Sequence, residues 1–160
     1  MDLVEKMQNK NRHPWELSRT QCILNIIRNQ NLNSVADIGA GDNYFTTNLR
    51  QFVPGLVYAI DTGYSEKTKS DDAIHYLSNI SALPNLNGKC GILLMDVLEH
   101  IENDSAFLKS TLEKISVGST VLITVPAFQF LFSEHDQFLK HYRRYNRKQL
   151  LNLIKTKICA

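Results

Sequence analysis

Apolar positions along the chain recur at two spacings, which predict helices that alternate with strands. Leu17, Leu24 and Ile27 show the helical spacing, because they fall on one face of a helix that begins at Pro14. Short apolar runs bounded by turn residues predict buried strands at Ser34–Ile38, Leu56–Ile60, Ile74–Leu77, Gly91–Asp96 and Ser119–Val125. The predicted helices are Pro14–Asn29, Asp42–Phe52, Asp104–Ile115 and a last helix from Asn146 through Ile154, with a loop or short helix at Thr62–Asp72.

This alternation predicts an α/β fold. Strands and helices in turn form right-handed crossovers, so the sheet is expected to be parallel and covered by helices on both faces. The length of 160 residues suits one domain with a substantial core. Functional sites of such sheets lie beyond the carboxyl ends of the strands. The residues that follow each predicted strand are therefore the candidates for a site.

Composition and charge exclude several classes of protein. The chain has 18 Lys and Arg against 16 Asp and Glu, and its formal charge of +2 is too small to indicate a nucleic-acid partner. The longest apolar run, Cys90–Leu98, contains Asp96 and is too short to span a membrane, and the first 30 residues have no secretion signal. The cysteines, Cys22, Cys90 and Cys159, form no CxxC pair and favour a reducing compartment. We therefore expect a cytoplasmic protein.

A glycine turn follows the first predicted strand and precedes a helix. Gly39 and Gly41 allow the backbone to bend sharply and to approach a ligand. Asp61 follows the next strand, 20 residues after Gly41, where an acidic side chain can accept hydrogen bonds from both hydroxyls of a ribose. Strand, turn, helix, strand and acid come in the order that a nucleoside-binding unit requires.

The residues around this turn favour a nucleoside without phosphate. A dinucleotide site needs a small residue at position 44, where Tyr44 stands, and Asp42 would repel a pyrophosphate. S-adenosylmethionine has a ribose and an adenine but no phosphate. Its positive ammonium and sulfonium groups suit nearby carboxylates such as Asp37 and Asp96.

Several segments together resemble the class I S-adenosylmethionine-dependent methyltransferases. The segments are DIGAGDNYF (37–45), NISALP (79–84) and GILLMDVLEHI (91–101). In the first segment Asn43 replaces the family's third glycine, and in the second Asn79 replaces the usual Asp. HPWELSR (13–19) and the long stretch Val125–Leu150 resemble one branch of these enzymes. The resemblance runs from about His13 to the end of the chain.

The resemblance implies a Rossmann-like, doubly wound and mainly parallel sheet of strand order 3-2-1-4-5. The family fold continues with two more strands, so we expect either a truncated chain that lacks them or a dimer in which a second copy covers the edge strand 119–125. Within one domain, the resemblance implies an N-terminal helical lid (1–30), a cofactor-binding core (31–125) and an acceptor-side segment with the final helix (126–160). The expected cofactor-binding residues are Arg19, Asp37, Gly39, Ala40, Gly41, Asp61, Thr62, Asn79, Ile80 and Asp96.

Candidate chemistry lies in two places. Asp96, Glu99 and His100 end the fourth strand, although Glu99 and His100 also suit a purely structural role in a loop. The densest polar cluster covers 133–145 and is either an acceptor pocket or a charged turn before a helix. We expect His100, His135 and His141 as catalytic candidates. The expected substrate-binding residues are Glu134, Asp136, Tyr142, Arg143 and Arg144.

Two further sets of residues leave their roles open. Trp15 and Arg19 share one helix face, and Arg19 either reaches the methionine carboxylate or is a solvated charge. Glu134, His135, Asp136 and His141 are metal-ligand types, but their spacing fixes no geometry, so we expect no metal.

The predicted function is methyl transfer from S-adenosylmethionine to a small-molecule, lipid or sugar acceptor, preferably at oxygen. One alternative is a domain that binds S-adenosylmethionine without catalysis. An NAD-dependent oxidoreductase or epimerase is disfavoured by Tyr44 and by the lack of a Tyr-x-x-x-Lys pair.

Overall fold

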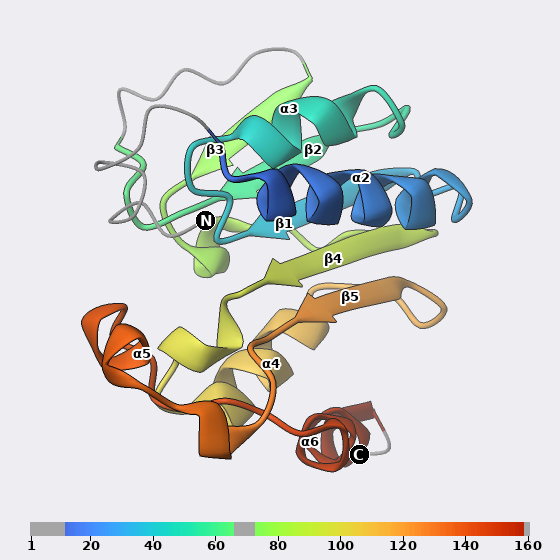
Figure 1. Cartoon of the computed structure of the whole chain (residues 1–160). Coiled ribbons are helices and arrows are strands. Elements are labelled where there is room, and N and C mark those ends of the chain that lie inside the picture. Colours follow the sequence, from blue (N-terminus) through green and yellow to red (C-terminus); the bar gives the residue numbers. More distant parts are fainter. Residues whose placement is uncertain (1–11, 66–72, 159–160) are drawn as a thin grey trace.

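The computed structural model describes residues 12–65 and 73–158, and it contains one parallel five-stranded sheet (Figure 1). The strand order is β3-β2-β1-β4-β5, as the resemblance implied. In chain order the strands are β1 (Ser34–Ile38), β2 (Val57–Ile60), β3 (Ile74–Leu77), β4 (Cys90–Met95) and β5 (Thr120–Thr124). All five predicted strands are therefore confirmed, with ends that differ by one residue at most.

Helices cover both faces of the sheet, as predicted (Figure 1). The helices are α2 (Pro14–Arg28), α3 (Tyr44–Arg50), α4 (Asp104–Leu112), α5 (Glu134–Phe138) and α6 (Arg147–Ile158). Helices α2 and α3 lie on one face, and α4 and α6 lie on the other. No helix within 12–65 or 73–158 is long and apolar enough to cross a membrane.

Side-chain alternation along the strands builds one apolar layer on each face. In β1, Val35 packs with Ile27 of α2 and Leu49 of α3, whereas the next residue, Ala36, belongs to the opposite layer. The opposite layer includes Leu108 of α4. Successive side chains of a strand point to opposite faces, so a strand buried on both faces needs apolar residues at nearly every position. Strands β1 and β4 meet this requirement, and each lies in the interior of the sheet between two other strands.

Several helix boundaries differ from the predicted ones, and two of the differences have local causes. Helix α3 begins at Tyr44 instead of Asp42, because Asn43 has a left-handed backbone (φ 66°) and cannot be part of the helix. Helix α4 ends at Leu112, short of the predicted Ile115. Helix α5 was not predicted, and a capping box between Ser133 and Asp136 forms its start. The predicted loop at 62–72 lies partly outside the described residues.

The segment between β5 and α6 is a loop whose two ends lie together. Ala127 and Tyr145 form a parallel bridge, and the Phe128 N–H donates to the Tyr145 carbonyl at 2.8 Å. Tyr145 is buried, and its hydroxyl lies 2.8 Å from Asp104 Oδ2 and 3.1 Å from the Leu98 carbonyl. We call residues 127–145 the closed loop; it contains α5 and faces the carboxyl end of β4 (Figure 1).

Strand β5 is an edge of the sheet. Its only strand partner within the described residues is β4. Pairing of this edge with a second copy of the chain stays a prediction.

Candidate functional site

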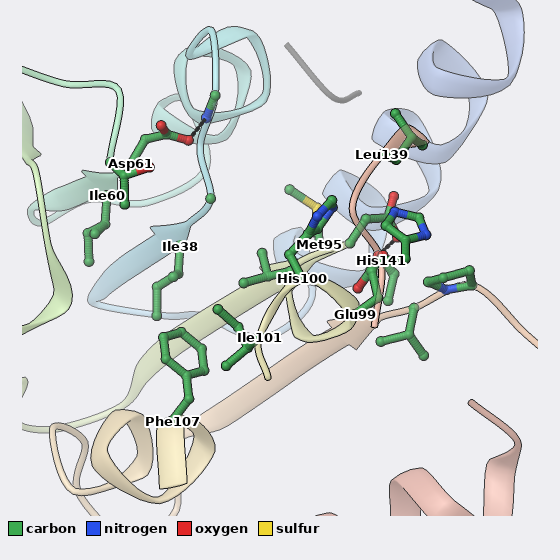
Figure 2. A pocket seen from close by; sticks show the side chains of 18 of the residues that line it. Ile38, Ile60, Asp61, Met95, Glu99, His100, Ile101, Phe107, Leu139 and His141 are labelled. Atoms are coloured by element: carbon green, nitrogen blue, oxygen red, sulfur yellow. Dashed lines mark hydrogen bonds between the residues drawn. The ribbon is translucent and has the colours of Figure 1, made fainter. Parts of the chain in front are cut away.

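A cavity of about 920 Å³ lies at the carboxyl ends of the strands, where the parallel sheet predicts a site (Figure 2). Gly39 follows β1, Asp61 follows β2, Asn79 follows β3 and Asp96 follows β4, and all four line the cavity. Pro126, after β5, lines it too. The sheet therefore brings together residues that lie far apart in the sequence.

The glycine turn after β1 forms one wall of the cavity. Gly39 and Gly41 have positive φ angles of 74° and 55°, which glycine adopts without strain. A Cβ at Gly39 would lie 2.6 Å from Val97 Cγ2, so the turn packs directly on the segment after β4. A Cβ at Gly41 would meet no described atom within 4 Å. The backbone at Gly41 is thus open to a ligand in the cavity.

Asp61 is held beside this turn by backbone donors. The Gly41 N–H donates to Asp61 Oδ2 at 2.9 Å, and the Gly63 N–H donates to Oδ1 at 2.8 Å. Each carboxylate oxygen is fixed by one bond and keeps capacity to accept another. Thr62 also lines the cavity here.

Asn79 and Ile80 line the cavity beyond β3. The Asn79 side chain caps the short 3-10 turn Ile80–Ala82, because its Oδ1 accepts from the Ala82 N–H at 3.1 Å. The amide is therefore held in one orientation beside Ile80.

Asp96 and Arg19 form an ion pair that joins β4 to α2. Asp96 has a left-handed backbone (φ 56°), and its Oδ1 accepts from the Thr124 hydroxyl at 2.9 Å. The Arg19 guanidinium lies 4.3 Å from the centre of the Trp15 ring, and both side chains line the cavity. Helix α2 thus supplies one side of the site. Arg12, which pairs with Asp42 of the glycine turn, ties the start of the same helix to that turn.

Glu99 is an acidic residue of the cavity wall that lies shortly after β4. It is fully buried, and neither of its side-chain oxygens has a hydrogen-bond partner in the described part of the chain. Burial raises the pKa of Glu99 to about 7, although the charge of Arg19 acts in the opposite direction. His100 and His141 lie beside Glu99, with ring centres 4.6 Å apart and ring planes at 85° (Figure 2).

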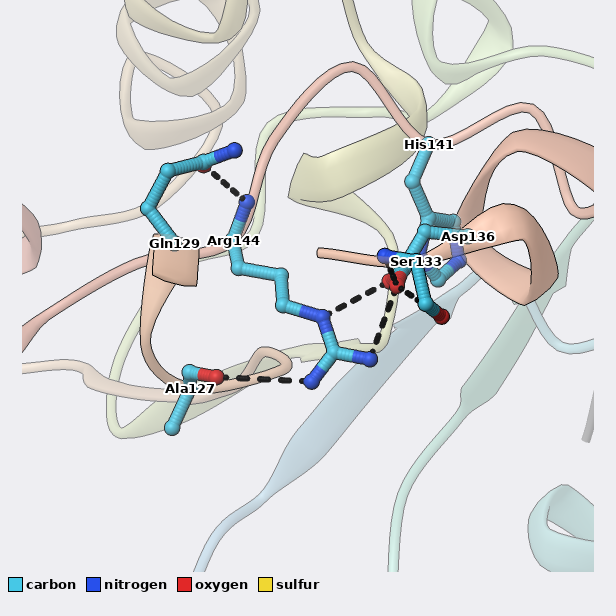
Figure 3. Close-up of polar contacts among 6 residues, drawn as sticks. All are labelled: Ala127, Gln129, Ser133, Asp136, His141 and Arg144. Carbon is cyan, nitrogen blue, oxygen red and sulfur yellow. Dashed lines mark hydrogen bonds and ion pairs between the residues drawn. The ribbon is translucent and has the colours of Figure 1, made fainter. Parts of the chain in front are cut away.

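Asp136 of α5 organises the closed loop (Figure 3). Its carboxylate accepts two bonds from Arg144, at 2.8 and 2.9 Å, and lies 3.0 Å from His141 Nδ1. The Ser133 N–H donates to it at 2.8 Å. Burial alone would raise the pKa of Asp136, but the bonds from Arg144, His141 and Ser133 outweigh burial and hold it well below its usual range. Asp136 is therefore a fixed anion that orients His141.

Most of the predicted site residues line the cavity. The predicted catalytic candidates that line it are His100, His135 and His141. The other predicted residues that line it are Arg19, Gly39, Gly41, Asp61, Thr62, Asn79, Ile80, Asp96, Asp136 and Arg144.

Five predicted site residues lie outside this lining. Asp37 and Ala40 are buried beneath the glycine turn, where Asp37 accepts from the Thr46 hydroxyl at 2.5 Å. Glu134 and Tyr142 are exposed. Arg143 pairs with Asp104 at 2.9 Å and thereby holds the closed loop against the start of α4.

The cavity also has wall residues that were not predicted. Thr124 and Leu139 are examples. The rule that sites follow strand ends already indicates Thr124, the last residue of β5. Leu139 shows no such signal, because it follows a helix that was itself not predicted.

Comparison with known proteins identifies similar structures. No protein-family model and no curated protein sequence matches the chain. Phosphoethanolamine N-methyltransferase 2 of Haemonchus contortus, in complex with S-adenosyl-L-methionine, superposes with a TM-score of 0.70 at 17% identity, over 88% of this chain and 36% of that chain. A methyltransferase from Archaeoglobus fulgidus that is dependent on the same cofactor gives 0.69 at 18% identity, over 98% of this chain and 74% of that chain.

A third similar structure binds a different acceptor. It is the 1,6-didemethyltoxoflavin-N1-methyltransferase of Burkholderia thailandensis, with bound 1,6-didemethyltoxoflavin and S-adenosylhomocysteine. Its TM-score is 0.62 at 16% identity, over 87% of this chain and 65% of that chain. The chain spans 36% to 62% of several of the methyltransferases that it resembles. The chain therefore has the fold of the class I S-adenosylmethionine-dependent methyltransferases, which confirms the predicted fold class.

Proposed function

We propose that the chain binds S-adenosylmethionine in this cavity and transfers its methyl group to a small-molecule acceptor. The observation that carries the proposal is the position of Asp61. Its carboxylate is held by the N–H groups of Gly41 and Gly63 at the cavity wall, with capacity left to accept from a ribose. The similar structures that contain S-adenosylmethionine or S-adenosylhomocysteine support this choice of ligand.

The other walls complement the remaining parts of this cofactor. Asn79 and Ile80 offer an amide and an apolar side chain to the adenine. The ion pair of Arg19 and Asp96 offers one charge of each sign, which suits the carboxylate and the ammonium of the methionine moiety. Helix α2, which carries Arg19, would then cover the bound cofactor as the predicted lid.

A dinucleotide fits this site less well. Its pyrophosphate needs free space at the start of α3. Tyr44 occupies the first position of that helix, and the Arg12 guanidinium lies 3.7 Å from the centre of its ring. Tyr44 therefore stands where a dinucleotide site needs a small residue.

In methyl transfer the protein itself forms and breaks few covalent bonds. A lone pair of the acceptor forms the new bond to the methyl carbon while the carbon–sulfur bond breaks and its electron pair returns to sulfur, which leaves neutral S-adenosylhomocysteine. The protein aligns the acceptor and excludes water. A hydroxyl acceptor also gives up a proton, and His100, His135 and His141 are the imidazoles that line the cavity. We therefore place the acceptor beside these residues and propose oxygen as the atom methylated.

Asp61→Ala tests the proposal. Removal of two charge-assisted hydrogen bonds to the ribose should weaken binding of S-adenosylhomocysteine by about 100-fold, measured by calorimetry. The matched control is Glu113→Ala, because Glu113 is an exposed acid at the end of α4 that does not line the cavity. The Glu113→Ala variant should bind S-adenosylhomocysteine with the same affinity as the original chain.

Two results would contradict this function. Unchanged affinity in Asp61→Ala, or binding of NAD in place of S-adenosylhomocysteine, would refute the proposed cofactor site. Normal binding without transfer of a labelled methyl group to any of a panel of hydroxyl and amine acceptors would instead favour a domain that binds the cofactor without catalysis.

A further inference from the structure

Glu99, His100 and His141 bring three side chains that commonly bind metals to one point of the cavity wall (Figure 2). One oxygen of Glu99 and one nitrogen of each histidine lie within 4.8 Å of one another. Glu99 and His100 belong to the short 3-10 turn Leu98–His100 after β4, and His141 belongs to the closed loop. The Tyr142 N–H donates to the Glu99 carbonyl at 2.7 Å, which fixes the two segments to each other.

The carboxylate of Glu99 needs a partner that the described residues do not provide. Glu99 is fully buried, and neither of its side-chain oxygens has a hydrogen bond within 12–65 or 73–158. A buried carboxylate without a partner is costly, and buried charges in proteins are normally paired or coordinate a metal ion. A cation bound between Glu99 and the two imidazoles would remove this cost.

His141 is oriented as a metal-ligating histidine usually is. Its Nδ1 lies 3.0 Å from Asp136 Oδ1, so its Nε2 is left to face another group (Figure 3). Metal-binding histidines typically bond a carboxylate through the nitrogen that does not bind the metal, which fixes the ring and its tautomer. Asp136 is in turn held by Arg144 and Ser133, so the ring of His141 has a rigid support.

We infer that Glu99, His100 and His141 form a binding site for a divalent transition-metal ion. One carboxylate and two imidazoles are a ligand set of catalytic zinc sites and of iron, manganese and cobalt sites, whereas magnesium and calcium prefer oxygen ligands alone. Ligand atoms around a tetrahedral ion lie about 3.4 Å apart, so the three side chains need to approach one another by about 1.4 Å at most. The sequence indicated a different group of possible ligands, and His141 is the one residue that the two groups share.

A metal ion at this position would select the acceptor, and this role rests on the proposed function. Three protein ligands leave coordination positions open, as in catalytic zinc sites. All three side chains line the cavity that Asp61 and Asp96 also line. A divalent ion orients oxygen donors and lowers the pKa of a hydroxyl that it contacts. The site therefore favours acceptors with a hydroxyl group that is methylated at oxygen.

The test measures metal binding by the chain of 160 residues, without an affinity tag and after treatment with a chelator. Titration with Co²⁺, followed by visible absorption, should give one site, and Zn²⁺ should compete for it while Mg²⁺ should not. Glu99→Gln and His141→Ala should each weaken Co²⁺ binding by more than about 100-fold, beyond the 10- to 100-fold loss typical of an outer-shell change. Glu99→Gln keeps the shape of the side chain and removes its buried charge, so its fold should persist, which thermal unfolding will verify.

His135→Ala is the matched control. His135 lines the same cavity but does not belong to the cluster, so its removal should leave Co²⁺ affinity unchanged. Equal Co²⁺ affinity in the original chain, Glu99→Gln and His141→Ala would overturn the inference, and so would a loss in His135→Ala as large as that in His141→Ala. Binding of S-adenosylhomocysteine, measured without metal in the same samples, reports separately on the proposed function.

Discussion

Asp37 in β1 and Asp136 in the closed loop are both carboxylates that the fold buries almost completely, and their environments are opposite. Asp37 accepts one bond, from the Thr46 hydroxyl, and its other oxygen has no partner among the described residues. Burial raises the pKa of Asp37 to about 7, and the charge of Asp61 adds to this effect. Asp136 has a guanidinium, an imidazole and a backbone donor, which keep its pKa well below the usual range.

The difference shows that two halves of the site are built by different means. On the side of β1 and β2, backbone groups of the glycine turn form the site, and the apolar layer beneath them leaves a buried charge poorly compensated. On the side of β4 and the closed loop, a network of charged side chains positions His141. Burial alone therefore does not decide the charge of a carboxylate; its partners do.

Asp37→Asn should produce the largest change. The native pKa of about 7 exceeds the unfolded value of roughly 4, so native Asp37 holds a proton that the unfolded chain releases between these pH values. The contribution of Asp37 to the free energy of unfolding should fall by about 4 kcal/mol as pH rises from roughly 4 to 7. Asparagine does not titrate, so the variant should gain stability relative to the original chain over this range.

Urea unfolding of both chains at a series of pH values measures this difference, and subtraction removes the contributions of all other groups. Parallel stability curves for the two chains would show that Asp37 is as well compensated as Asp136, and the contrast between the two halves would disappear.

Asp136→Ala should cost about 3 kcal/mol of unfolding free energy at pH 7, because Arg144 and His141 then lose the anion that both contact. Urea unfolding measures this loss. Arg143→Ala is a useful reference, because Arg143 is more exposed than Arg144 and pairs with Asp104 at 2.9 Å. Its effect should be smaller, about 1 kcal/mol or less. Equal effects would mean that the Asp136 network adds nothing beyond an ordinary surface pair.

Substitutions in the glycine turn should change the free energy of unfolding least. They test whether backbone geometry forms this side of the site. Alanine at Gly39 combines a positive φ with a Cβ 2.6 Å from Val97, and it should cost about 2 kcal/mol of unfolding free energy. Alanine at Gly41 has the strained backbone but meets no described atom within 4 Å, and it should cost about 1 kcal/mol. Thermal unfolding compares the two variants, and a reversed order would contradict the described packing of the turn.

Much of the architecture could be predicted because it depends on local patterns. Strand ends were predicted within one residue, and the positions of Gly39, Gly41 and Asp61 followed from the order of the elements around them. Parallel strands align their carboxyl ends, so a residue after a strand can be assigned to the site without knowledge of its contacts. Helix α5 also has a local signal, the spacing of Ser133 and Asp136, which form a capping box.

The partners of the charged side chains could not be predicted, because they come from distant segments. Arg19 pairs with Asp96, which is 77 residues away, and Glu99 meets His141 across the cavity wall. Arg144 was expected to hold a substrate, and the structure pairs it with Asp136. Any exposed charge in a cluster has several alternative partners, and only the packed structure selects among them.

The bridge between Ala127 and Tyr145 means that the closed loop leaves and rejoins the body of the protein at a single point. A loop anchored in this way can change in length without moving β5 or α6, since each doubling of loop length costs only about 0.6 kcal/mol of closure entropy. Changes of length or sequence within the closed loop can therefore leave the strands and helices that flank it in place.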